Sequence, residues 1–161
     1  MARTILDALH EGTNRDQLGC AAHEVGHGVV HHLAGIPIRE MRIWPQRQGW
    51  AGVCTPAVTR ITDEQVPCYQ VGLMAGAAAA YRFLTRYTDL GPRRAREVAE
   101  AGAHHDLPDF DRLHRQHRDG ASIGLPEARR LAAALVDRHG RRIDQLTLTL
   151  ATRHHLPGRA L

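Results

Sequence analysis

Residues 20–32 read CAAHEVGHGVVHH, an Ala- and Val-rich run in which Glu24 lies between His23 and His27. Side chains at i and i+4 of a helix project side by side, so both imidazoles can reach one Zn²⁺ at about 2 Å from each ring nitrogen. Glu24 lies too far round the helix to be a ligand, but it can act as a general base towards water, as in the HExxH pattern. The alternative is that two histidines fall one turn apart by chance in a chain with 12 histidines.

The residues around this motif predict a helix over 15–34. Asn14 with Gln17 resembles a capping box, and Gly35 supplies a stop. The expected core stripe is spaced by threes and fours and consists of Leu18, Ala22, Val25, Val29 and Leu33. At 100° per residue the two histidines fall opposite that stripe. We therefore expect one face to pack and the other to display the imidazoles, with Gly26 leaving room beside them.

The rest of the chain predicts a hairpin and further helices. Residues 38–55 alternate apolar and polar side chains around a longer turn that contains Gly49. Helices are expected over 63–88, over 93–103, from Asp106 to Asp119-Gly120, and over 126–155 with a break at Gly140. The fold class is thus mainly α with a small β-hairpin or sheet. We expect a single domain over 1–161, with 1–14 as an N-terminal extension.

A zinc site needs a third protein ligand, and Asp106 is the candidate. It begins a predicted helix, where the helix dipole and free amides favour a carboxylate, although a simple N-cap role is the alternative. His31 lies about 6 Å further along the helix axis, too far to join the same ion, so His31 and His32 are expected at the rim or surface. Cys20 is expected to be a small buried thiol rather than a ligand.

The composition excludes several classes of function. The formal net charge is +4, but all 21 basic residues are arginine, acidic residues are interleaved with them, and aromatic residues make up only 4%. This pattern disfavours nucleic acid as a partner.

Three cysteines without paired spacing fit a reducing cytoplasm, and the longest apolar run, residues 71–81, is too short to cross a membrane. We therefore expect a soluble cytoplasmic protein.

Four segments in order resemble the peptidase domain of FtsH-type AAA+ zinc metalloproteases. They are AAHEVGHGVV, the hairpin IREMRIWPQRQGWAGVCTP, GAHHDL, and the tail LAAALVDRHGRRIDQLTLTLATRHHLPGRAL, which together cover residues 18–161. GAHHDL is similar to the family's GASNDL segment, whose Asp is the third zinc ligand and maps onto Asp106. His104 and His105 replace Ser and Asn there, and either could compete for the metal or bind substrate. The family's GGRAAEE helix segment is matched here only by AGAAAAY, and nothing in residues 1–161 resembles its ATPase module or membrane anchor.

The resemblance implies a stand-alone, FtsH-peptidase-like zincin domain. His23, His27 and Asp106 would hold Zn²⁺, and Glu24 would activate water to cleave a peptide or a small amide. Substrate would add to an exposed strand of the 38–55 hairpin by backbone pairing. The resemblance also allows a homo-oligomer and a partner ATPase. The alternative is a non-catalytic zinc-binding assembly or adaptor module, although an intact Glu24 is of no use to a pure scaffold.

Overall fold

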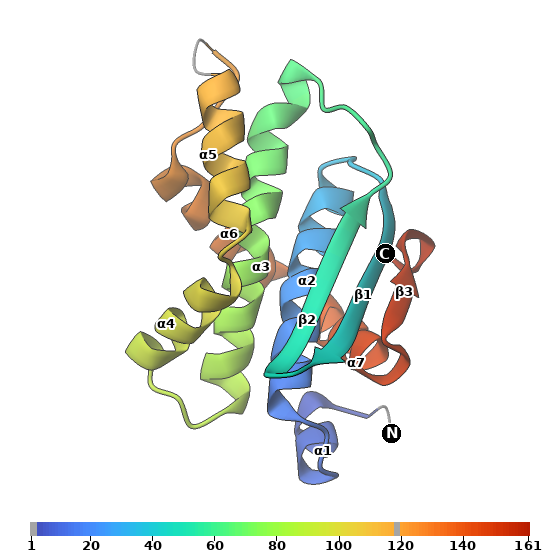
Figure 1. Ribbon diagram of the computed structural model, residues 1–161. Helices are drawn as coiled ribbons and strands as arrows, with labels where there is room; N and C mark the ends of the chain where they lie inside the picture. The colour runs from blue at the N-terminus through green and yellow to red at the C-terminus, as the bar shows by residue number, and fades with distance from the viewer. Residues whose placement is uncertain (1–2, 118–119) are drawn as a thin grey trace.

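The computed structural model describes residues 3–117 and 120–161 and is mainly helical with a small antiparallel sheet (Figure 1). Its helices are α1 (Ile5–His10), α2 (Arg15–Leu33), α3 (Val66–Tyr87), α4 (Pro92–Gly102), α5 (Asp106–Gln116), α6 (Leu125–Arg138) and α7 (Gly140–Arg153). Its strands are β1 (Ile38–Gln46), β2 (Gly49–Pro56) and β3 (His155–Pro157), and the short 3₁₀ helices η1 (Asp63–Gln65) and η2 (Gly158–Ala160) complete the described elements. The predicted mainly-α class with a small sheet is confirmed.

Helix α2 is the central element, with α3 along one side and the sheet along the other (Figure 1). The Asn14 side chain caps its start by accepting hydrogen bonds from the amides of Asp16 and Gln17, at 2.7 and 3.2 Å. The reciprocal half of the expected capping box is missing, because the side chain of Gln17 turns to α7, where its Nε2 donates to the Ala151 carbonyl oxygen. Because neighbours cover α2 on both sides, the expected split into a packed face and a displayed face is wrong: His27 is buried.

Two details of the predicted packing of α2 are also wrong. Leu33 is 47% exposed, because it is the last residue of the helix and projects beyond the core. Gly26 does not leave room beside the histidines but faces α3, where an added Cβ would lie 2.5 Å from the Ala75 carbonyl oxygen and 2.6 Å from the Ala79 Cβ. The small residues therefore let the backbones of α2 and α3 approach closely.

The sheet has the strand order β2-β1-β3, with β2 at one edge. The expected longer hairpin turn is wrong: β1 continues through Pro45, and two residues connect Gln46 to its partner Gly49. A proline is tolerated there because β3 pairs only with residues 40–42, so β1 has one neighbour at Pro45. Gly49 follows the turn with φ +92, which favours glycine.

The C-terminal segment contains a strand, β3, that the sequence did not predict. Helix α7 stops at Arg153 because His154 adopts a left-handed conformation with φ 59, so the expected continuation of the helix to 155 is wrong. Residues 155–157 then pair with β1. The break at Gly140 is confirmed, because α6 and α7 are separated by His139.

Residues before α2 contribute to the same hydrophobic core as the rest of the chain. Helix α1 starts with a capping box between Thr4 and Asp7, and it buries Ile5 and Ala8 in that core. At the other side, α4 and α5 follow α3 and lie against it (Figure 1). Asp119, where α5 was expected to stop, lies outside the described residues, and the helix ends at Gln116. Within residues 3–117 and 120–161, every helix is too short or too polar to cross a bilayer.

Candidate metal centre

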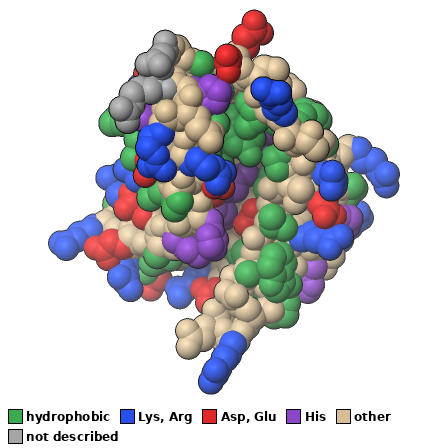
Figure 2. Space-filling view, turned by 45° about the horizontal axis from the view of Figure 1, so that its top comes forward, with side chains coloured by type: hydrophobic (Ala, Val, Ile, Leu, Met, Phe, Trp, Pro, Cys, Tyr) green, Lys and Arg blue, Asp and Glu red, His purple; other side chains and the backbone are tan. Residues whose placement is uncertain are grey.

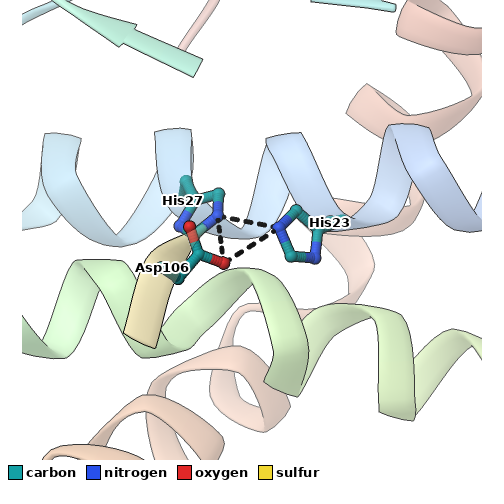
Figure 3. Close-up of side chains that lie close together, drawn as sticks. All are labelled: His23, His27 and Asp106. Carbon is teal, nitrogen blue, oxygen red and sulfur yellow. Dashed lines mark hydrogen bonds and ion pairs between the residues drawn. The ribbon is translucent and has the colours of Figure 1, made fainter. Parts of the chain in front are cut away.

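Helix α2 places the side chains of His23 and His27 next to each other (Figure 3). Their Nε2 atoms are 3.0 Å apart and their rings meet edge to face, with centroids 4.7 Å apart. This is the geometry expected of residues at i and i+4. Histidine side chains also line a hollow on the surface between the helical half of the molecule and the sheet half (Figure 2).

Asp106 brings a carboxylate to the same point from a distant part of the chain (Figure 3). It is the first residue of α5, and its amide donates to the Ala103 carbonyl at 3.0 Å, which closes the turn from α4. Its Oδ2 lies 3.2 Å from Nε2 of His23 and 3.4 Å from Nε2 of His27. His105 occupies the N-cap position, so the alternative of Asp106 as the N-cap is wrong.

The spacing of these three atoms matches what one metal ion requires. Four ligands arranged as a tetrahedron at about 2.0–2.1 Å from zinc lie about 3.3–3.4 Å from one another. The observed separations are 3.0, 3.2 and 3.4 Å. Oδ2 of Asp106 is buried and makes no hydrogen bond of good geometry, although both ring nitrogens are close. His23, His27 and Asp106 could therefore hold a metal ion together.

A backbone carbonyl fixes which nitrogen of His27 faces the metal position. Nδ1 of His27 lies 2.8 Å from the carbonyl oxygen of Gly72 on α3. A carbonyl oxygen only accepts, so Nδ1 must be the protonated donor. In the neutral ring this leaves the lone pair on Nε2, directed towards His23 and Asp106. Metal-binding histidines commonly use such an outer hydrogen bond to fix the ring and its tautomer.

The charges at the site compensate one another even without a cation. Burial lowers the pKa of His27, but the close contact with the Asp106 carboxylate and its charge outweigh this and raise the pKa to about 9. Burial raises the pKa of Asp106, but the close contacts with the His23 and His27 imidazoles outweigh this and hold it well below its usual range. The carboxylate is therefore ionised, and a divalent cation would take the place of the proton on the imidazole pair.

Glu24 lies beside this group and beneath strand β2. Its side chain is 7% exposed, and an added Cβ on Gly52 of β2 would lie 2.6 Å from both Cγ and Oε1 of Glu24. Burial raises the pKa of Glu24, while the charges of His23 and His27 lower it. A carboxylate whose pKa is raised above its usual value is better suited to taking up and returning a proton.

His31 differs from its prediction, whereas His32 agrees with it. His32 is exposed, but His31 is 3% exposed, so the expectation of a rim position is wrong for His31. The reason is that α3 covers this turn of α2: the His31 ring packs against Gly72, and its centroid is 4.6 Å from that of Tyr69. Burial lowers its pKa to about 3, and its Nδ1 has no hydrogen-bond partner among the residues that the structure describes. His31 is not a member of the metal-ligand group.

The other residues that the sequence analysis weighed lie outside the ligand group. His104 and His105 are exposed, with ring centroids 3.9 Å apart, and Nδ1 of His104 is near the Ala101 carbonyl oxygen. Cys20 is half-buried, and burial together with the charge of Glu24 raises its pKa to about 12. The roles of Gly52 and Gly72 were not predicted. Their signal was present in the sequence, because only glycine leaves space where a backbone passes against a functional side chain.

The fold and the site define a mainly helical protein with a His-His-Asp group that could hold a metal ion. A scan of the sequence against protein-family models found no match, and a search of curated proteins found none.

Proposed function

We propose that the chain is a zinc-dependent hydrolase that cleaves peptide or other amide bonds. The observation that carries this proposal is the position of Glu24. Its carboxylate is buried next to the His23–His27 pair rather than in solvent, and it has a raised pKa. A site used only to bind metal has no need of a second buried carboxylate beside the ligands, because burying such a group costs stability.

Zinc fits the ligand set better than the common hard cations. Two imidazoles and one carboxylate are donors that zinc accepts, whereas Mg²⁺ and Ca²⁺ prefer oxygen ligands in larger number. If zinc is bound, these three residues would leave room for a further ligand such as water, as in catalytic rather than structural zinc sites. Gly76 keeps this region open, because an added Cβ there would lie 2.7 Å from Nε2 of His23.

The residues of the chain then have distinct tasks in hydrolysis. A bound zinc ion supplies Lewis acidity, which acidifies water and polarises a carbonyl group. Glu24 takes a proton from the attacking water as the new C–O bond forms. It then gives this proton to the amide nitrogen as the C–N bond breaks. The Gly72 carbonyl fixes the orientation of the His27 ring. Asp106 balances the positive charge of the ligand group.

The likeness to FtsH-type peptidase domains belongs to the same proposal. In that interpretation the fold is an FtsH-peptidase-like zincin domain, and substrate lies extended along β2. The outer edge of β2 is not paired by any strand among the described residues, and Gly52 brings this strand over Glu24. A peptide that adds to this edge by backbone hydrogen bonds would therefore pass next to the general base.

The test compares the native chain with Glu24→Gln, using Glu127→Gln as a control at an exposed position on α6. Zinc content and cleavage of a broad peptide library are measured for all three. We expect about one zinc in each protein and loss of cleavage in Glu24→Gln alone. Zinc in all three with cleavage in none would support the non-catalytic module instead. Cleavage that persists in Glu24→Gln would exclude Glu24 as the base.

A further inference from the structure

A cavity of about 310 Å³ lies between α3, α4, α6 and the start of α5. Its floor is apolar and includes Met74, Ala78, Ala99 and Leu107. The volume is at the lower end of the range of small-molecule sites in proteins. It is therefore large enough for a small ligand with a short hydrocarbon body.

This cavity is separate from the metal centre. Met74, Ala78 and Tyr81 of α3 line the cavity, whereas Gly72 and Gly76 of α3 face the histidines of α2. At 100° per residue these two groups lie on opposite sides of α3. The cavity is thus not part of the proposed active site.

The rim of the cavity is strongly positive. It carries three arginines, Arg96, Arg129 and Arg130, and a single carboxylate, Glu100. Glu100 lies 3.8 Å from Arg129. The guanidinium of Arg96 lies 5.6 Å from the centroid of the ring of Tyr81, which also lines the cavity. Among residues 3–117 and 120–161, neither Arg96 nor Arg130 has an ion-pair partner within 4.0 Å.

The geometry points to a binding site for an amphipathic carboxylate, with the hydrocarbon chain on the alanine-rich floor and the carboxylate between Arg96 and Arg130. Guanidinium groups bind carboxylates through paired hydrogen bonds, and the charge excess at the rim selects an anion over a cation. The apolar floor favours an acid with a short chain over a fully hydrophilic one such as citrate.

An occupant would also contact the segment that carries Asp106. Ala103 and Leu107 both line the cavity, and they flank the turn from which Asp106 reaches the histidines. A ligand that holds this turn in place stabilises the position of the carboxylate. Because coupling between two sites is reciprocal, bound ligand should tighten metal binding by the same factor as bound metal tightens ligand binding.

Binding is tested first on the metal-free protein by calorimetric titration with decanoate below its micelle concentration. Decanamide and decyltrimethylammonium serve as neutral and cationic probes with a matched chain. We expect saturable binding of one decanoate and at least about tenfold weaker binding of the other two, since the charged contacts are lost. Absence of saturable binding, or equal binding of the cationic probe, would overturn the proposal.

The second arm uses variants. Arg96→Met with Arg130→Met should weaken decanoate binding at least about tenfold, and Ala78→Leu should do so by filling the floor. The control is Arg93→Met with Arg138→Met, on the same two helices but outside the cavity. Equal weakening in the control, or none in the cavity variants, would overturn the assignment. If the native chain binds no decanoate but forms a dimer, and Ala78→Leu dissociates that dimer, a second copy of the chain covers the cavity and the proposal is overturned.

The coupling is tested by zinc titration of the native chain with and without saturating decanoate. We expect about fivefold tighter zinc binding with decanoate. The Arg96→Met and Arg130→Met double variant should show no such change. Because decanoate itself binds zinc in solution, this variant serves as the control for that effect. Equal zinc affinity in both conditions would overturn the coupling. None of these readouts depends on hydrolysis, so their failure would leave the proposed function untouched.

Discussion

Gly76 on α3 packs directly against the imidazole ring of His27 on α2. Any side chain at this position would enter the space between the two histidines. We predict that Gly76→Ala weakens zinc binding about tenfold to 100-fold, the range seen when residues that support metal ligands are changed. Overpacking should also lower the free energy of unfolding by about 1–3 kcal/mol.

Zinc titration and urea denaturation of Gly76→Ala check this prediction. The control is Gly102→Ala, because an added Cβ at Gly102 would meet nothing within 4 Å. Unchanged zinc affinity in Gly76→Ala would contradict the contact between α3 and the metal centre.

Asp106→Ala is expected to reduce bound zinc from one ion per chain to almost none after dialysis. The reason is that two imidazoles alone hold zinc weakly, and the buried positive charge loses its counter-ion. The double variant His104→Ala and His105→Ala should retain zinc. If zinc is lost from the double variant and kept in Asp106→Ala, one of the exposed histidines is the ligand.

His31→Leu should keep one zinc per chain and unfold within about 1 kcal/mol of the native protein, because removing an unpartnered buried nitrogen offsets the lost packing. His27→Leu, by contrast, should lose zinc. Metal analysis and thermal unfolding of the two variants check this. Loss of zinc from His31→Leu would make His31 a ligand.

Asp144→Ala should lower the free energy of unfolding by about 1–3 kcal/mol. The Asp144 carboxylate accepts two hydrogen bonds from Arg82, at 2.6 and 3.1 Å, and one from the Tyr87 hydroxyl at 2.6 Å, which ties α7 to α3. The exposed pair Arg93–Glu97 offers a matched contrast, because Glu97→Ala should change stability by less than about 0.5 kcal/mol. Urea denaturation distinguishes the two, and equal effects would contradict the prediction.

Alkylation at pH 8 should modify Cys68 first, because it is the exposed thiol. Burial and the charge of Glu24 raise the pKa of Cys20 to about 12, and the same causes raise the pKa of Cys54. A raised pKa leaves little thiolate at pH 8, and thiolate is the reactive form. Mass spectrometry of the native and urea-unfolded protein checks this, and rapid labelling of Cys20 in the native protein would contradict the burial.

The sequence predicted local features of the fold better than long-range ones. The apolar spacing in α2 and the alternation over residues 38–55 are properties of single segments, and both elements are confirmed. Strand β3 was not predicted, because its three residues form a strand only by pairing with β1, which is distant in sequence. The short helix α1 was not predicted for a similar reason, since a helix of this length depends on packing for its stability.

The same distinction applies to the candidate site. The spacing of His23 and His27 predicted their approach. Asp106 was a candidate third ligand because it begins a predicted helix, and the resemblance pointed to the same residue, but no local pattern joins α5 to α2. The burial of His31 depends on where α3 and Tyr69 lie, and periodicity along α2 carries no such information. The glycines of α3 allow close packing, but which side chains they accommodate is decided by the tertiary structure.

Asp106 is the point at which α5, which otherwise rests on α3, reaches α2. A cation bound there would cross-link α5 and α2, two helices that are far apart along the chain. Cross-linking of this kind restricts the unfolded chain more than the folded one. Chelation would then release α5 before the centre of the molecule loosens, so the rate at which a protease cuts between α4 and α5 would report metal occupancy.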